Sequence, residues 1–316
     1  MKNKIINIST IILIITFIFS AVPTTFSASK LEEVSISYVK LPLNVPSIVE
    51  KEKQLFEKEF NPDGIEVNFP EITQGSKMTQ AVAAGSLDFC NALGGTSLIL
   101  AAANGVDIKM IGTYSRAPKA FNIMAKDPDI QTTADLRGKK VVGPKGTILH
   151  QLLLASLVEN NLDLNDLEFV NLGIARGISA LLAGSADAAL VAGPAVPQAL
   201  KNGAHIIESG EGLLDATIVI AVSGEFLDKH PAVVERYLRV HQKSLKFMEE
   251  NPEETFTMVA EETGISKENV EKMYSWYDFN PEITESDITE LKKTQDFLFE
   301  NGMLLESIEI ESLIVE

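Results

Sequence analysis

The sequence predicts an α/β fold in which two β/α lobes are joined by a two-strand hinge. Three observations support this prediction: the length of the chain, the order of its elements, and a segment that recurs 99 residues later. The chain has 316 residues, whereas one domain commonly holds about 100–150. Strand, loop, helix and strand follow one another in both halves, which is typical of right-handed parallel β/α units.

The recurring segment covers residues 81–95 and residues 180–194. Its identical positions are Ala81, Ala84, Gly85, Ser86, Asp88 and Gly94, matching Ala180, Ala183, Gly184, Ser185, Asp187 and Gly193. Each copy predicts a helix that ends at a left-handed glycine, then a short buried strand and a glycine-bearing loop. Chance similarity of two Ala-Gly-rich stretches is the alternative, and the shared Ala-Gly-Ser-x-Asp pattern favours two similarly built lobes.

The elements around the two copies agree with this interpretation. Predicted strands cover 34–39, 65–69, 140–143, 167–171 and 218–222, and predicted helices cover 48–60, 148–159 and 231–248. Residues 284–287 resemble a capping box that starts a further helix, which Asn301 and Gly302 end. The resulting organisation is a signal peptide at 1–28, lobe 1 at 29–114 and 218–316 with the C-terminal helices, and lobe 2 at 115–217.

The N-terminal segment has the pattern of an export signal. Lys2 and Lys4 precede an apolar run over residues 11–21, and small or polar residues follow it. An uncleaved N-terminal anchor is the alternative. No cysteine lies in or directly after the run, so a lipid-modified N-terminus is not expected. We therefore expect the protein in the periplasm or at the extracellular face of the cytoplasmic membrane.

Charge and cysteine content narrow the possible partners. The net charge is −17, and removal of Lys2 and Lys4 with the signal makes it −19. Such a surface repels nucleic acid and anionic membranes, but it does not exclude a small anion held by oriented N–H groups at short range. Cys90 is the only cysteine. It lies in a predicted strand, where a buried, unreactive thiol is expected.

Loops at the ends of four predicted strands are the expected ligand contacts, because ligands of open α/β sheets bind there. Gly94 and Gly95 allow close backbone approach, and Thr96 or Ser97 offers a hydroxyl that could cap the following helix. The expected ligand-binding residues are Lys40, Leu43, Asn44, Gly94, Gly95, Thr96, Ser97, Ser115, Arg116, Lys145, Gly146, Thr147, Gly193 and Pro194. For the hydroxyls, helix capping alone is the alternative. Arg116 could pair with the ligand or with a surface carboxylate.

Motifs for catalysis are missing from the sequence. Residues 143–147 lack the spacing of a phosphate-binding loop, and no Gly-x-Ser-x-Gly segment occurs. The histidines His150, His205, His230 and His241 do not have the spacing of metal ligands. We therefore expect a protein that is not an enzyme, with no catalytic residues, no cofactor and no metal.

Several motifs occur in the order found in one protein family. They lie at residues 38–44, 84–88, 93–97, 134–140, 144–150 and 226–231. In these motifs the chain resembles the nitrate, sulfonate and taurine family of ABC substrate-binding proteins, which also includes binders of a thiamine pyrimidine precursor. The resemblance implies the periplasmic-binding-protein fold, type II-like, with residues 95–97 and 145–147 at the cleft.

The resemblance also implies a function. The expected protein captures a small anion, such as an alkanesulfonate, taurine or nitrate, and delivers it to ABC permease subunits in the membrane. We expect it to act as a monomer and not to bind nucleic acid. A binder of a thiamine pyrimidine precursor, an enzyme on the same fold and a sensor remain alternatives. The four loops contain few aromatic residues to enclose a pyrimidine, which favours the anion.

Overall fold

A computed structural model describes residues 31–40 and 43–315 of the chain, and the predicted signal peptide lies outside them. The strands form a two-stranded parallel sheet, β1-β2; a three-stranded sheet in the order β3-β10-β4; and a five-stranded sheet in the order β7-β6-β8-β5-β9. Their bounds are β1 (Glu33–Ser35), β2 (Glu66–Asn68), β3 (Phe89–Gly94), β4 (Ile108–Arg116), β5 (Phe121–Ala125), β6 (Lys140–Gly143), β7 (Glu168–Asn171), β8 (Ala188–Ala192), β9 (His205–Ser209) and β10 (Thr217–Ser223).

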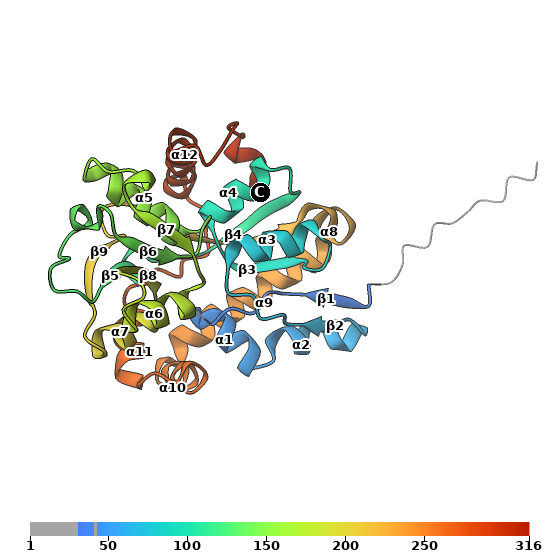
Figure 1. Cartoon of the computed structure of the whole chain (residues 1–316). Helices are drawn as coiled ribbons and strands as arrows, with labels where there is room; N and C mark the ends of the chain where they lie inside the picture. Colours follow the sequence, from blue (N-terminus) through green and yellow to red (C-terminus); the bar gives the residue numbers. More distant parts are fainter. Residues whose placement is uncertain (1–30, 41–42, 316) are drawn as a thin grey trace, which may run out of the picture. The chain divides into compact units, whose positions relative to one another are not determined.

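Two lobes form around these sheets, as predicted (Figure 1). We call the part around the three-stranded sheet lobe 1 and the part around the five-stranded sheet lobe 2. The helices of lobe 2 are α5 (Ile148–Glu159), α6 (Ile174–Leu182) and α7 (Ala195–Lys201). The helices of lobe 1 are α1 (Val45–Glu52), α2 (Leu55–Phe60), α3 (Gly75–Ala83), α4 (Gly95–Ala103), α8 (Gly224–Lys229), α9 (Pro231–Glu250), α10 (Pro252–Thr263), α11 (Lys267–Tyr274) and α12 (Glu285–Glu300).

Most predicted elements are present, with three differences. The strand expected over residues 34–39 is only β1, after which Ile36 and Tyr38 form isolated bridges. The helix expected over residues 48–60 is two helices, because Gln54 adopts a left-handed conformation with φ 51° between α1 and α2. The strands are not all parallel: β6 is parallel to β7 and β8, whereas β5 and β10 run antiparallel to their neighbours. Strand β5 is the first strand after the chain enters lobe 2, and β10 is the strand on which the chain returns to lobe 1. The chain reverses direction at each passage.

The repeated segment builds the same local structure in both lobes. Gly85 and Gly184 have φ values of 67° and 72°, which glycine adopts without strain. The Ser86 and Ser185 hydroxyls donate to the carbonyls of Ala81 and Ala180, both at 3.1 Å. The Asp side chain that follows then ties the helix end to a strand of its lobe, β1 in lobe 1 and β6 in lobe 2. Asp88 Oδ2 accepts the Ser35 N–H at 2.8 Å, and Asp187 Oδ2 accepts the Lys140 N–H at 2.7 Å.

The two lobes are joined where β4 and β10 lie side by side. Thr217 pairs with Arg116 at the end of these strands, and the chain between them supplies β5 to β9. The segment before α12 runs along the same place, because Arg116 exchanges backbone hydrogen bonds with Asp278. The division into 29–114 with 218–316 and 115–217 remains our proposal for the lobe boundaries.

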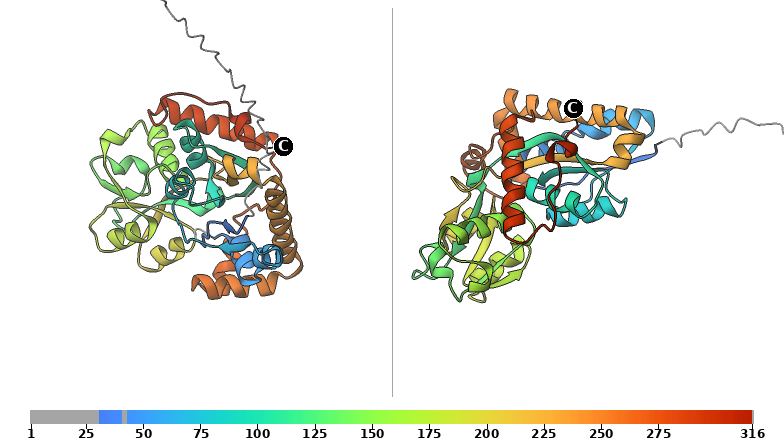
Figure 2. Two further views of the ribbon diagram at one scale, coloured as in Figure 1. Left: turned by 90° about the vertical axis from the view of Figure 1, so that its right-hand side faces the viewer. Right: turned by 90° about the horizontal axis from the view of Figure 1, so that it is seen from above.

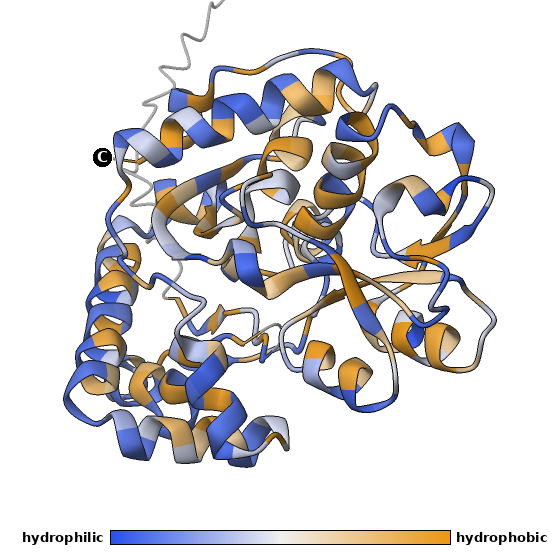
Figure 3. Ribbon diagram, turned by 90° about the vertical axis from the view of Figure 1, so that its left-hand side faces the viewer, coloured by the Kyte–Doolittle hydropathy of each residue, from blue (hydrophilic) through white to orange (hydrophobic). Residues whose placement is uncertain are grey.

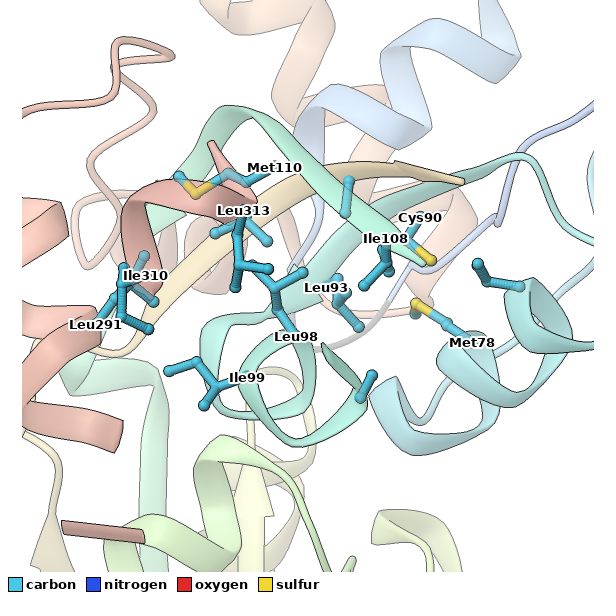
Figure 4. Packing of buried hydrophobic residues seen from close by; sticks show 14 of the residues in the cluster. Met78, Cys90, Leu93, Leu98, Ile99, Ile108, Met110, Leu291, Ile310 and Leu313 are labelled. Carbon is cyan, nitrogen blue, oxygen red and sulfur yellow. The ribbon is translucent and has the colours of Figure 1, made fainter. Parts of the chain in front are cut away.

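Apolar side chains fill both lobes. In lobe 1, residues of α3, β3, α4, β4 and α12 meet in one cluster that includes Met78, Leu93, Leu98 and Leu291 (Figure 4). Helix α12 lies against α4 at this cluster (Figure 2). In lobe 2, buried apolar residues of the sheet and of α6 and α7 form a second cluster. Figure 3 shows the strands of this sheet as mainly hydrophobic, whereas the helices at the edge of the molecule also carry hydrophilic residues. Cys90 is fully buried in the lobe 1 cluster, as predicted. In the described part of the chain, no helix is both long and apolar enough to span a membrane.

Candidate functional site

A cavity of about 290 Å³ lies between the two lobes. Lobe 1 and the strand that returns to it contribute Val39, Thr73, Gln74, Gly75, Lys77, Met78, Ala92, Gly94, Ser97 and Ile218. Lobe 2 contributes Phe121, Pro144, Thr147, Ile148, Leu149, Gly173, Ile174, Ala175, Arg176 and Ala192. The volume is at the small end of the range for small-molecule sites. We call this cavity the interlobe pocket.

Four helices begin at the interlobe pocket. Their N-cap residues are Gln74 for α3, Gly94 for α4, Thr147 for α5 and Gly173 for α6, and all four line the pocket. None of these residues caps its helix with a side-chain hydrogen bond, and none of the four first turns contains an acidic residue. The first N–H groups of a helix carry partial positive charge and need acceptors from outside the helix. The pocket is therefore suited to an anion.

Two cations stand at the same helix starts. Lys77 and Arg176 each occupy the third position, of α3 and α6 respectively. Basic residues are unfavourable there because they face the positive end of the helix dipole. Among the described residues, neither side chain forms an ion pair, and no Asp or Glu lines the pocket. A bound anion would compensate the charge of both side chains and of the helix ends.

Our sequence analysis missed Lys77 and Arg176, although the sequence contains a signal for them. They are 99 positions apart, which is the offset of the repeated segment. The repeat extends backwards through α3 and α6, whose bounds also differ by this offset. The two helices share identical residues only near their ends, and Lys77 and Arg176 are similar in charge but not identical.

The rest of the pocket wall is largely apolar. Val39, Met78, Phe121, Leu149 and Ile218 line it, and each is at most 6% exposed. Phe121 is the only aromatic residue among the lining residues. The combination of positive helix starts and apolar walls fits a small anion that carries an apolar group.

Three of the residues predicted to bind the ligand line this pocket: Gly94, Ser97 and Thr147. Gly94 lies close to lobe 2, since a Cβ there would be 3.1 Å from the Ile148 side chain. Ser97 does not cap α4; its hydroxyl donates to the Gly146 carbonyl across the cleft at 2.8 Å. The Thr147 hydroxyl donates to the Pro144 carbonyl at 2.8 Å. These residues thus shape the pocket and the contact between the lobes.

The residues predicted after the first strand lie outside the pocket lining. Lys40 Nζ is 3.5 Å from a carboxylate oxygen of Glu262. Leu43 and Asn44 are fully buried at the start of α1. The structure therefore shows no contact between these three side chains and the interlobe pocket.

The predicted residues near the hinge do not line the pocket. Gly95 faces Leu291 and the Thr217 carbonyl, and its Cβ would be 2.7 Å from the Leu291 side chain. Thr96 donates to Gln151 at 2.5 Å. Ser115 is fully buried. The Arg116 guanidinium binds both oxygens of Asp287, at 2.6 and 2.5 Å, and one oxygen of Asp278 at 3.1 Å.

The remaining predicted residues flank the pocket in lobe 2. Lys145 is exposed, and its backbone N–H donates to Asn171 Oδ1 at 3.0 Å. Gly146 has φ 71° and lies beside Leu100 of lobe 1. Gly193 and Pro194 are buried and do not line the pocket.

The potentially reactive side chains lie away from the pocket. Burial raises the pKa of the Cys90 thiol well above its usual value. Burial, with a smaller contribution from Lys145, lowers the pKa of His150 to about 4. His150 is fully buried and stacks on Phe169, with ring centroids 4.9 Å apart. Within residues 31–40 and 43–315, no three His, Cys, Asp or Glu side chains form a group that could hold a metal ion.

The fold and the pocket define a two-lobed protein of the periplasmic-binding type, with a ligand site between the lobes. The chain belongs to the NMT1/THI5-like family, whose model matches residues 44–255. A relative from Bacillus subtilis, which carries the name of an aliphatic sulfonates-binding protein, is 29% identical; the match covers 85% of this chain and 82% of the relative. The taurine-binding periplasmic protein of Escherichia coli is 28% identical over 68% of this chain and 66% of its own length.

Solved structures support the same fold. The alkanesulfonate-binding protein SsuA from Xanthomonas axonopodis pv. citri, bound to MOPS, superposes with a TM-score of 0.82 at 22% identity; the match covers 91% of this chain and 99% of SsuA. The fold also occurs in an enzyme. The desulfurization enzyme DszB matches with a TM-score of 0.65 at 15% identity, over 90% of this chain and 96% of DszB. Fold alone therefore does not separate binding from catalysis.

Proposed function

We propose that this protein is an exported solute-binding protein of an ABC importer that captures an organic sulfonate in the interlobe pocket. The main support for the proposal is the position of two cations at one cavity with apolar walls. Lys77 and Arg176 each lie at one of the four helix starts that line this cavity. A sulfonate offers three oxygens that share one negative charge, and the site offers guanidinium, ammonium and backbone N–H donors. The names of the sulfonate-binding and taurine-binding relatives support the same class of ligand.

The pocket favours an alkanesulfonate over taurine or nitrate. Taurine carries an ammonium group, and no Asp or Glu among the lining residues could pair with it. An unpaired charge in a desolvated site is costly. Nitrate would leave the apolar walls formed by Val39, Met78 and Phe121 without contacts. A thiamine pyrimidine precursor is less suitable, because Phe121 alone could stack on its ring.

Binding without catalysis is part of the proposal. Cys90 is fully buried in the core of lobe 1 and does not line the pocket, so it cannot attack a bound ligand. His150 is likewise buried outside the lining. We propose that the loaded protein acts as a monomer outside the cytoplasmic membrane and delivers its ligand to ABC permease subunits.

A ligand panel tests the proposal. Isothermal titration and thermal unfolding of the full chain would compare hexanesulfonate, ethanesulfonate, taurine, nitrate and 4-amino-5-hydroxymethyl-2-methylpyrimidine. We expect the alkanesulfonates to bind most tightly and, at about 100 times the dissociation constant, to stabilise the fold by about 2.7 kcal/mol. Binding of the pyrimidine with no response to any sulfonate would refute it. Conversion of a bound sulfonate to products would refute the claim that the protein is not an enzyme.

A further inference from the structure

Gln151 connects the two lobes at a place outside the interlobe pocket. It lies on α5 of lobe 2 and is 7% exposed. Its amide oxygen accepts the Thr96 hydroxyl of α4 at 2.5 Å, and its amide nitrogen donates to the Thr294 hydroxyl of α12 at 3.1 Å. Both partners belong to lobe 1, and both are at most 6% exposed. One buried side chain of lobe 2 is thus held at both ends by lobe 1.

The surroundings of Gln151 are closely packed. The space among Gly95, Gln151, Leu291 and their neighbours is about 10 Å³, which holds at most one water molecule. The hydrogen bonds of the amide therefore depend on the two threonine hydroxyls. When the lobes separate, water can satisfy all three side chains. The arrangement consequently favours the state in which the lobes are in contact.

Gln151 is separate from the interlobe pocket, since it does not line it. A residue that touches the ligand changes the affinity for different ligands by different factors. A substitution that shifts only the equilibrium between open and closed lobes alters the fraction of protein that is ready to bind. The apparent affinity for every ligand then changes by the same factor.

We infer that Gln151 is a positioning residue that sets the closing equilibrium of the two lobes through Thr96 and Thr294. Burial of the Gln151 amide in the closed state costs free energy, and the hydrogen bonds with both hydroxyls offset this cost. Removal of the amide leaves the two hydroxyls buried without partners. The inference goes beyond the proposed function and uses the sulfonates of that proposal as probes.

The test compares Gln151→Leu with Gln295→Leu. Gln295 is a matched control, because it is also 7% exposed and its amide also makes two hydrogen bonds, both to the backbone of Ile308 within lobe 1. Titration with ethanesulfonate and with hexanesulfonate should show about 10-fold weaker binding of both ligands to Gln151→Leu, by the same factor. Gln295→Leu should lower the melting temperature and leave both affinities unchanged.

A triple variant supplies the rescue. Thr96→Val and Thr294→Val, added to Gln151→Leu, remove the unpaired hydroxyls, and we expect most of the lost affinity to return. Unchanged affinity in Gln151→Leu, a loss for one sulfonate only, or an equal loss in Gln295→Leu would overturn the inference.

Small-angle X-ray scattering without ligand separates this inference from the proposed function. The radius of gyration of Gln151→Leu should exceed that of the unaltered protein, while that of Gln295→Leu should not. This comparison applies even if no sulfonate binds, in which case the proposed function alone fails. Equal radii for all three proteins would contradict a role in closing.

Discussion

The helix starts that carry a cation at the interlobe pocket are alike in the two lobes, whereas the contacts between the lobes are not. Helices α3 and α6 each bring a cation to the interlobe pocket at equivalent positions, Lys77 and Arg176. Behind them, Asp88 and Asp187 each accept a backbone N–H of a neighbouring strand, β1 in lobe 1 and β6 in lobe 2. The same local structure thus places positive charge at the pocket twice.

The next helix of each lobe differs. Helix α4 begins with Thr96 and Ser97, whose hydroxyls both bond to lobe 2. Helix α7 follows the repeat in lobe 2, and its start contains Ala195 and Val196, which are buried. Positive charge at the pocket is thus placed alike in the two lobes, whereas the first turn of α4, and not that of α7, supplies hydroxyls that bond to the other lobe.

The largest effect is expected at the buried ion pair that lies where the two lobes are joined. Arg116→Met should lower the free energy of unfolding by about 3–5 kcal/mol, because it leaves Asp287, whose side chain is 2% exposed, without its ion pair. Urea unfolding measures the loss. As a control, Arg236→Met breaks a more exposed pair with Glu59 and Asp63 and should cost about 1 kcal/mol. Equal losses would contradict the importance of burial at Arg116.

The same ion pair predicts a response to acid. Burial raises the pKa of Asp287, but hydrogen bonds from Arg116 and Thr284 lower it more, so the pKa lies below its usual value of about 3.8. The charged form is therefore favoured by folding, and its contribution is present above about pH 4 and is lost as the pH falls through the lowered pKa. Stability measured between pH 5 and pH 2 should fall less steeply in Asp287→Asn. An unchanged slope would contradict this assignment.

A smaller effect is expected at the two cations of the pocket. Lys77→Gln and Arg176→Gln should each weaken hexanesulfonate binding about 10- to 100-fold, since a charged hydrogen bond contributes about 1.5–3 kcal/mol. Titration calorimetry measures both variants, with Lys201→Gln at the end of α7 as the control. If only one of the two substitutions weakens binding, the symmetry of the pocket is wrong.

The next prediction concerns the repeated aspartates. Asp88→Ala and Asp187→Ala each leave one backbone N–H without its acceptor, that of Ser35 or Lys140. We expect each to lower the free energy of unfolding by about 1–3 kcal/mol. Urea unfolding followed by circular dichroism would compare them. A loss in one lobe and none in the other would show that the two copies differ in role.

The smallest effect is expected at the repeated glycines. Gly85→Ala and Gly184→Ala should each cost about 1 kcal/mol, because the left-handed conformation strains an alanine and no atom lies within 4 Å of the added Cβ. Thermal unfolding should give matching decreases. Gly138 also has a left-handed conformation and no atom within 4 Å of an added Cβ. The decrease in melting temperature of Gly138→Ala therefore measures the backbone strain outside the repeated segment.

The fold could be predicted in large part because its signals are local. Helix α5 over Ile148–Glu159 and strand β6 over Lys140–Gly143 have the predicted bounds. The capping box at Thr284 and Asp287 also starts α12 as predicted. The break at Gln54 was missed, since a left-handed glutamine has no sequence signature comparable to that of glycine.

The site was harder to predict, because it depends on which side chains face one another across the lobes. Loop position identified Gly94, Ser97 and Thr147 as pocket residues. It also suggested Arg116, which is engaged by Asp278 and Asp287, two residues more than 160 positions away in sequence. The cations Lys77 and Arg176 lie in the first turn of helices that do not follow any of the four loops predicted to bind the ligand.

A crystal structure of the protein with hexanesulfonate would test the central claim most directly. We predict that the sulfonate oxygens lie within hydrogen-bond distance of both Lys77 and Arg176 and near the first N–H groups of α3 and α6, with the alkyl chain against Met78 and Phe121. A ligand bound outside the interlobe pocket, or one whose sulfonate points away from both cations, would contradict the account.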